Sequence, residues 1–154
     1  RQMCIRDSDS LGIDVPMATA IADAAAARRD YLDETGGRYV HIIADSSLRN
    51  SGDVAKAIAC GADAVSLGLP LATAASAGAP NWYWPSTAGH PKLPRGLVEE
   101  VGLGDEPLPL KELLFGPTAN PVGGENIIGA LRRSMAKCGY TDIKSFQKVD
   151  LVVR

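Results

Sequence analysis

Two polar turns in the middle of the chain carry residue types suited to binding a phosphorylated ligand. The first, residues 45–47 (Asp-Ser-Ser), follows an apolar run over 39–44, and the second begins at Gly68 after a run over 63–67. A carboxylate accepts hydrogen bonds from sugar hydroxyls, serine supplies a hydroxyl donor, and glycine lets a backbone N–H approach a phosphate closely. In a βα barrel the loops after the last two strands commonly form a phosphate site.

The pattern around these turns predicts parallel strands joined by helices. A helix is expected over residues 16–35, a strand over 39–44, a helix with Ser51 as its N-cap, and a strand over 63–67. Alternating strands and helices with short connections are typical of right-handed βαβ units and a parallel sheet. The nearly continuous apolar run over 39–44 predicts a strand that is covered on both faces.

The second half of the chain has a different character. Residues 79–126 hold most of the prolines and both tryptophans, which predicts a long irregular excursion. A short helix is expected within it at 109–115. A helix is expected from Ile127 to its stop at Gly139, and the alternation over 146–153 predicts a terminal strand or extended segment.

Composition limits the classes of protein that come into question. The chain has 154 residues with a net charge of −2, a balance that gives no reason to expect nucleic acid or an anionic membrane as a partner. Its longest apolar runs fall short of the ~20 residues of a membrane span. Three scattered cysteines indicate a reducing, cytoplasmic environment. Residues 1–8 match nothing around them and are interpreted as a translated adapter, which leaves 9–154 as part of a single domain.

Four segments in family order resemble the IMP dehydrogenase/GMP reductase family, closest to its short actinobacterial-type members without a CBS pair. Residues 12–21 resemble the segment after the catalytic loop, and 43–53 resemble the phosphate and ribose turn. Residues 57–68 are similar to the last barrel strand, and 131–139 to a late helix with a Leu-Arg pair before Met and Gly. The likeness therefore covers nearly the whole chain after the first residues.

The resemblance implies an α/β fold, namely the last two to three βα units of a TIM (βα)8 barrel plus a C-terminal extension. It implies, for an intact parent, conversion of IMP, NAD and water to XMP and NADH, with reduction of GMP to IMP by NADPH as the alternative. The cofactor would be NAD or NADP, and the intact enzyme could bind a monovalent cation in addition. The ligand would be a purine nucleoside monophosphate, and the assembly a homotetramer.

The resemblance also assigns roles to individual residues. Asp45 stands at the ribose-binding position, although an ordinary turn aspartate is the alternative. Ser46 and Ser47 replace two family glycines, which changes the phosphate turn. Gly68 matches a backbone amide aimed at phosphate, whereas Leu69, at a position where the dehydrogenase often has serine, cannot donate a hydrogen bond.

No catalytic residue is expected in this chain, because the family's Cys-Thr-Thr loop would lie just upstream of Gly12. Arg95 is a candidate only through a loose likeness to the arginine of a mobile flap, and a surface arginine is the alternative. His90 is interpreted as a solvated loop residue, and His41 as a core residue. Cys60 and Cys138 are both interpreted as core residues. The aromatic cluster (residues 82–84) is expected to anchor the excursion to the barrel or to face a neighbouring subunit. Arg49 either faces the ligand or is solvated.

Two other readings of the sequence stay open. One is a different barrel enzyme that uses the same turns to bind a sugar phosphate or a flavin. The family-like late helix at 131–139 disfavours this alternative. The other is a truncated product without activity, since two or three parallel strands cannot close a barrel and would leave their edges open.

Overall fold

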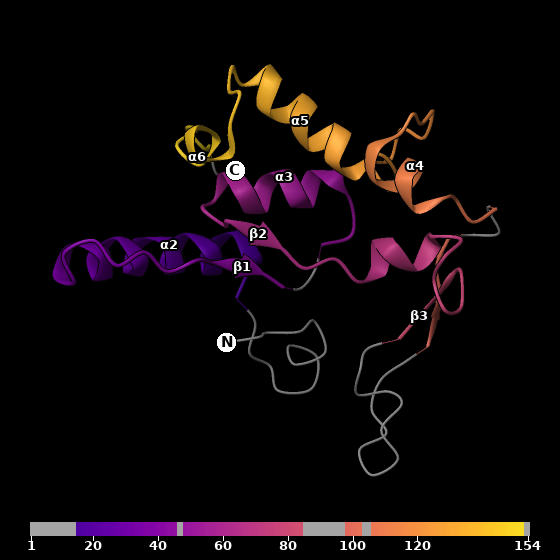
Figure 1. Cartoon of the computed structure of the whole chain (residues 1–154), viewed down its shortest axis with the longest axis horizontal. Helices are drawn as coiled ribbons and strands as arrows, with labels where there is room; N and C mark the ends of the chain where they lie inside the picture. The colour runs from indigo at the N-terminus through magenta and orange to yellow at the C-terminus, as the bar shows by residue number, and fades with distance from the viewer. Residues whose placement is uncertain (1–14, 46–47, 85–97, 103–105, 153–154) are drawn as a thin grey trace, which may run out of the picture.

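The computed structural model describes residues 15–45, 48–84, 98–102 and 106–152 (Figure 1). The described part begins with a long helix and a βαβ unit, followed by a short 3-10 helix. These elements are α2 (Met17–Glu34), β1 (Ile43–Ala44), α3 (Ser51–Ala59), β2 (Ala64–Val65) and η1 (Leu69–Thr73). The second half contributes β3 (Trp82–Tyr83), β4 (Glu99–Glu100), α4 (Leu110–Phe115), α5 (Ile127–Lys137) and α6 (Ile143–Phe146).

The predicted βαβ unit is confirmed. Strands β1 and β2 pair in parallel, with Ile43 opposite Ala64 and Ala44 opposite Val65, and α3 connects them. The N–H of Ser66 donates to the carbonyl of Ala44 at 2.8 Å, so the ladder continues one residue beyond β2. The carboxyl ends of both strands therefore lie at the same edge of the sheet.

Two helical layers cover one face of this sheet. Val54, Ala57 and Ile58 on α3 are buried, and α5 packs against the outer side of α3 (Figure 1). On α5, which confirms the helix predicted from Ile127, both Ile127 and Leu131 are buried. The core of the described residues thus lies between the sheet, α3 and α5.

The opposite face of the sheet is not covered. The prediction that the strand over 39–44 is covered on both faces is therefore wrong for the described residues. Ile43 is 63% exposed, and its partner Ala64 is exposed as well. The apolar run over 39–44 forms only two residues of strand, and Tyr39 and Val40 before it are also exposed. The reason is that α3 covers one side only, so every second residue of each strand faces away from the core.

The start of α3 lies one residue from the predicted N-cap. Asn50 is the cap, and its side-chain oxygen accepts from the N–H of Asp53 at 3.0 Å. Ser51 instead is buried inside the first turn, where its N–H donates to the carbonyl of Gly123 at 2.8 Å. The sequence alone could not distinguish two adjacent residues that both favour the N-cap.

Asn50→Ala is expected to lower the free energy of unfolding by about 1 kcal/mol, because the N–H of Asp53 would lose its acceptor. Ser51→Ala, which keeps the backbone bond to Gly123, is the matched control and is expected to cost less. Urea denaturation of both variants measures the difference. A larger loss for Ser51→Ala would contradict this assignment of the cap.

The second half holds elements that the sequence pattern did not predict. Within the excursion 79–126, β3 pairs antiparallel with β4, and the predicted short helix is confirmed as α4. Near the C-terminus α6 replaces the start of the expected extended segment, and Asp142 caps it by accepting from the N–H of Ser145 at 2.8 Å. No strand forms in the tail up to residue 152, the last described one.

Two interpretations of single residues are corrected. His41 is not a core residue, since its side chain is 74% exposed. Cys138 is exposed at the end of α5, one residue before the turn at Gly139 with φ +81°, whereas Cys60 is half-buried against the core. Cys138 follows Lys137, the last residue of α5, so the buried face of the helix ends before it.

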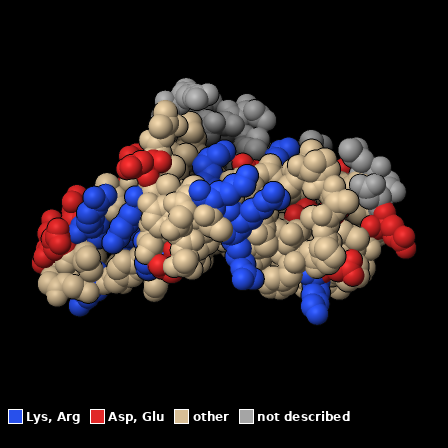
Figure 2. All heavy atoms as spheres, turned by 90° about the horizontal axis from the view of Figure 1, so that it is seen from above, with Lys and Arg blue, Asp and Glu red and all other residues tan. Residues whose placement is uncertain are grey.

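The surface carries both signs of charge. Figure 2 shows basic side chains across the middle of one face and acidic side chains mainly toward its two ends. None of the helices in the described ranges combines the length and the apolar character that crossing a membrane requires.

Candidate functional site

The structure brings two of the predicted ligand-binding residues to one edge of the sheet. Asp45 directly follows β1, Gly68 comes three residues after β2, and both are exposed. Both therefore lie at the carboxyl edge, the usual place for ligands in parallel α/β sheets. Ser46, Ser47, His90 and Arg95 fall outside the described residues.

Tyr83 lies against the Gly68 turn, a contact that the sequence pattern did not predict. A side-chain carbon added at Gly68 would lie 3.2 Å from Cε2 and 3.4 Å from the hydroxyl oxygen of Tyr83. The turn thus accommodates glycine because the tyrosine ring occupies the space that a side chain would need. The neighbouring Trp82 and Trp84 are 46% and 45% exposed, so both leave a large part of their surface to solvent.

A pocket of about 180 Å³ opens beside this turn. Its wall is made by the turn after β1, by η1, by the excursion and by the loop before α5. Leu69 from η1 lies in this wall, where it contributes an apolar surface and no donor. Its polar lining includes Arg49, Asn81, Glu106, Asn120 and Glu125.

The loop before α5 is held in place by its own side chains and by α3. The hydroxyl of Thr118 donates to Glu125, and the side-chain amide of Asn120 donates to the same carboxylate at 3.3 Å. Gly123, at φ +76°, accepts from the N–H of Ser51 at 2.8 Å. These contacts fix one wall of the pocket on the first turn of α3.

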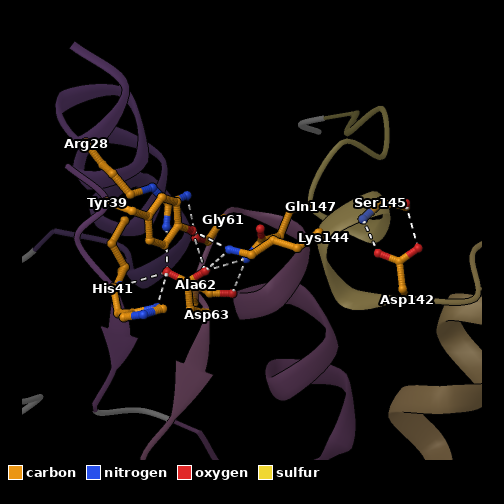
Figure 3. Close-up of polar contacts among 11 residues, drawn as sticks. Arg28, Tyr39, His41, Gly61, Ala62, Asp63, Asp142, Lys144, Ser145 and Gln147 are labelled. Atoms are coloured by element: carbon orange, nitrogen blue, oxygen red, sulfur yellow. Dashed lines mark hydrogen bonds and ion pairs between the residues drawn. The ribbon is translucent and has the colours of Figure 1, made fainter. Parts of the chain in front are cut away.

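A second polar cluster lies at the opposite, amino edge of the sheet and centres on Asp63 (Figure 3). The side chain of Asp63 is only 8% exposed, and Arg28 from α2 pairs with its Oδ2 at 2.5 Å. The hydroxyl of Tyr39 donates to Oδ1 at 2.6 Å, and Lys144 from α6 pairs with the same oxygen at 2.5 Å. One carboxylate therefore joins α2, the segment before β1, and α6.

Further contacts complete the surroundings of Asp63. The backbone N–H of Ile42 donates to Oδ2 at 2.9 Å, and the side-chain amide of Gln147 donates to the carbonyl of Ala62 at 2.7 Å. Arg28 also stacks over the Tyr39 ring at 5.0 Å from its centre. A buried carboxylate needs such partners because leaving it unpaired is costly.

These contacts keep Asp63 ionised. Burial by itself raises the pKa of the Asp63 carboxyl, but hydrogen bonds from Lys144 and Tyr39 outweigh it and hold that pKa well below its usual range. The hydrogen bond to Asp63 raises the pKa of Lys144 in turn. A carboxylate held this firmly is a poor proton shuttle, and its place at the amino edge of a parallel sheet indicates a structural role.

Cys60, the half-buried cysteine, does not offer an activated thiol. Burial raises the pKa of the Cys60 thiol, although Lys56 nearby opposes this slightly. A raised pKa leaves little of the reactive thiolate at neutral pH.

The described residues also set limits on cofactors. Among them, no group of three or more His, Cys, Asp or Glu side chains is arranged to hold a metal ion. Pockets that enclose a drug-sized ligand measure roughly 300–1,000 Å³, so the pocket of about 180 Å³ does not by itself enclose a dinucleotide.

The βαβ unit makes this an α/β protein, and its polar turns lie at the carboxyl edge, where parallel sheets commonly bind their ligands. The sequence profile of the IMP dehydrogenase/GMP reductase domain matches residues 3–92. The chain belongs to the IMP dehydrogenase/GMP reductase family.

Relatives and a solved structure agree with this assignment. An "uncharacterized oxidoreductase" of Mycolicibacterium smegmatis is 64% identical over 143 residues, which cover 93% of this chain and 38% of that protein. An inosine-5'-monophosphate dehydrogenase of Methanocaldococcus jannaschii is 31% identical over 169 residues, covering 89% of this chain and 30% of that protein.

A crystal structure of an IMP dehydrogenase/GMP reductase-like protein from Corynebacterium glutamicum superimposes with a TM-score of 0.86 at 61% identity. It covers 96% of this chain and 39% of that one. The chain thus shares the fold of this family and spans less than two fifths of the length of these relatives.

Proposed function

We propose that this chain supplies the nucleotide-binding edge of a purine-nucleotide oxidoreductase that converts IMP to XMP. The observation that carries the proposal is that Asp45 and Gly68 both lie at the carboxyl edge of β1 and β2, with Tyr83 against the Gly68 turn. The oxidoreductase names of the relatives and the domain match support the class of reaction. Reduction of GMP to IMP is the alternative direction.

The exposed sheet face supports the further proposal that residues 9–154 are part of a longer βα barrel. Ile43 and Ala64 pair on the face that α3 does not cover, and both are exposed. A barrel closes a parallel sheet on itself with helices outside, so one face of every strand looks inward. In this proposal the uncovered face is the inner wall. The homotetramer and the cytoplasmic location stay predictions.

Each residue at the edge has a task that suits its chemistry. The Asp45 carboxylate accepts hydrogen bonds from ribose hydroxyls, and the N–H of Gly68 donates to the phosphate. The Tyr83 hydroxyl lies close enough to the Gly68 turn to add a second donor to the same phosphate. Charge-assisted hydrogen bonds of this kind are the stronger ones in binding sites.

Tyr83→Phe is expected to weaken IMP binding by about three- to tenfold, because the phosphate would lose one hydrogen bond. Binding of inosine, which has no phosphate, is expected to stay unchanged. Trp84→Phe is the matched control, since Trp84 is exposed beside it. Equal effects of Tyr83→Phe on IMP and inosine would show that the hydroxyl does not contact phosphate.

Turnover is tested in a chimera in which this chain replaces the matching 143 residues of the Mycolicibacterium smegmatis protein. The intact relative serves as the control. Rising NADH absorbance with IMP and NAD supports the dehydrogenase, and falling absorbance with GMP and NADPH supports the reductase. An intact relative that turns over while the chimera is silent would contradict the proposal for this chain.

A further inference from the structure

The small sheet of β3 and β4 has two faces with different surroundings. On one face the half-buried Tyr83 contacts the Gly68 turn. Successive residues of a strand point to opposite faces, so Trp82 and Trp84 lie on the other, outer face, where both indoles are exposed. The register places Glu100 opposite Trp82, so the Glu100 side chain lies on this outer face as well.

The hydrogen-bond pattern brings the side chains of Trp82 and Glu100 close together. The N–H of Val101 donates to the carbonyl of Asn81 at 2.8 Å, so these two residues form a hydrogen-bonded pair. The two kinds of pair alternate along an antiparallel ladder, so Trp82 and Glu100 form the other kind, with Cα atoms about 4.5 Å apart. The exposed Glu100 carboxylate has no hydrogen-bond or ion-pair partner within the described part of the chain.

The spacing of the two indoles suits a flat cation between them. Residues two apart on a strand are about 6.8 Å apart, and a flat group in contact with two rings needs roughly 7 Å. Cations bind over the faces of aromatic rings, arginine more often than lysine. The guanidinium group of arginine is planar, stacks on aromatic rings, and forms forked hydrogen bonds with a carboxylate. Two indoles beside the Glu100 carboxylate therefore match a guanidinium group in shape and charge.

The openness of this face indicates a polypeptide as the source of the guanidinium group. The pocket beside the Gly68 turn is lined by Asn81 and Val101, and neither the two indoles nor Glu100 contributes to its wall. Small molecules are usually held in concave pockets, whereas exposed aromatic side chains are typical of protein interfaces.

We propose that the outer face of β3 and β4 is a docking surface for an arginine side chain of a partner polypeptide. The guanidinium group lies between Trp82 and Trp84 and pairs with the Glu100 carboxylate. This surface is separate from the carboxyl edge of β1 and β2, so the inference does not depend on the proposed function. Because the ion pair is exposed to solvent, binding weakens as the salt concentration rises.

The fluorescence of the whole 154-residue chain tests the proposal, since Trp82 and Trp84 are its only tryptophans. The probe is a pentapeptide with a central arginine between alanines. The matched peptide with citrulline, which is uncharged but has nearly the same shape, is expected to bind about three- to thirtyfold more weakly. Glu100→Gln is expected to weaken binding of the arginine peptide about two- to fivefold. Glu112→Gln, at an exposed glutamate of α4, is the matched control and should change nothing.

The outcomes decide between this surface and its alternatives. Equal binding of the arginine and citrulline peptides, or no fluorescence response to either, would overturn the proposal. So would a Glu100→Gln chain that still prefers arginine to the wild-type extent. A tryptophan spectrum that changes with the concentration of the chain alone, with dimers in analytical ultracentrifugation, would assign this face to a second copy and overturn the proposed partner.

Discussion

Asp63→Ala is expected to lower the free energy of unfolding by about 3–5 kcal/mol, the cost of breaking a buried ion pair by removing one partner. The Arg28 side chain, 13% exposed, would lose its carboxylate, and the backbone N–H of Ile42 would lose its acceptor. Lys144 contributes less to this loss, because its side chain is 59% exposed and can be hydrated. Urea denaturation followed by circular dichroism measures the effect.

Two variants make the Asp63 result interpretable. Asp63→Asn keeps an acceptor for the Ile42 N–H and is expected to cost less than Asp63→Ala. Asp150→Ala changes an exposed aspartate near the C-terminus and is expected to stay within about 0.5 kcal/mol of the wild type. If Asp63→Ala and Asp150→Ala cost the same, the cluster around Asp63 does not stabilise the fold.

The contribution of Asp63 also has a defined dependence on pH. Its pKa in the folded chain lies below that of an unfolded aspartate, about 3.9, so its stabilisation is fully present above that value. It is lost as the pH falls from there through the lowered pKa of the folded state. The difference in stability between wild type and Asp63→Asn should therefore be constant from about pH 5 to 8 and shrink below about pH 4.

Asp45→Ala is expected to weaken IMP binding by about ten- to hundredfold, because hydrogen bonds to a charged group are worth roughly 1.5–3 kcal/mol. Asp45 lies exposed at the carboxyl edge, directly after β1, so the substitution removes a ligand contact and little packing. Isothermal titration calorimetry with IMP measures the change.

Asp150→Ala serves again as the control for Asp45, since it removes an exposed carboxylate away from the carboxyl edge. Binding of inorganic phosphate should be unaffected by Asp45→Ala, because Asp45 is assigned to the sugar. Unchanged IMP affinity would mean that Asp45 is an ordinary turn residue, which was the alternative from the sequence.

Local patterns predicted the parts of the fold that depend on neighbouring residues. The β1–α3–β2 unit and α5 follow from apolar spacing over a few turns, and Gly139 marks the end of α5 where expected. The pairing of β3 with β4 was missed because Glu99–Glu100 stands in no apolar run, whereas β1 and β2 each lie within one. Such short strands carry no periodicity of their own.

The candidate site divides in the same way. Asp45 and Gly68 could be placed at one edge because the order of strands and turns fixes it. The contact of Tyr83 with Gly68 and the partners of Asp63 depend on tertiary packing, since Arg28 and Lys144 lie 35 and 81 residues from Asp63. The sequence around Asp63, which follows a glycine and an alanine, does not indicate that Arg28 or Lys144 pairs with it. The capping pair of α6, Asp142 and Ser145, was a local signal that could have been recognised.

Backbone-amide NMR of the 154-residue chain, titrated with IMP, tests the central claim most directly, since it locates the ligand as well as detecting it. We expect shifts of the Gly68 and Tyr83 amides and of those around Asp45, with little change around Asp63. Absence of any shift, or shifts centred on the amino edge near Asp63, would contradict the claim that the carboxyl edge of β1 and β2 binds a purine nucleotide.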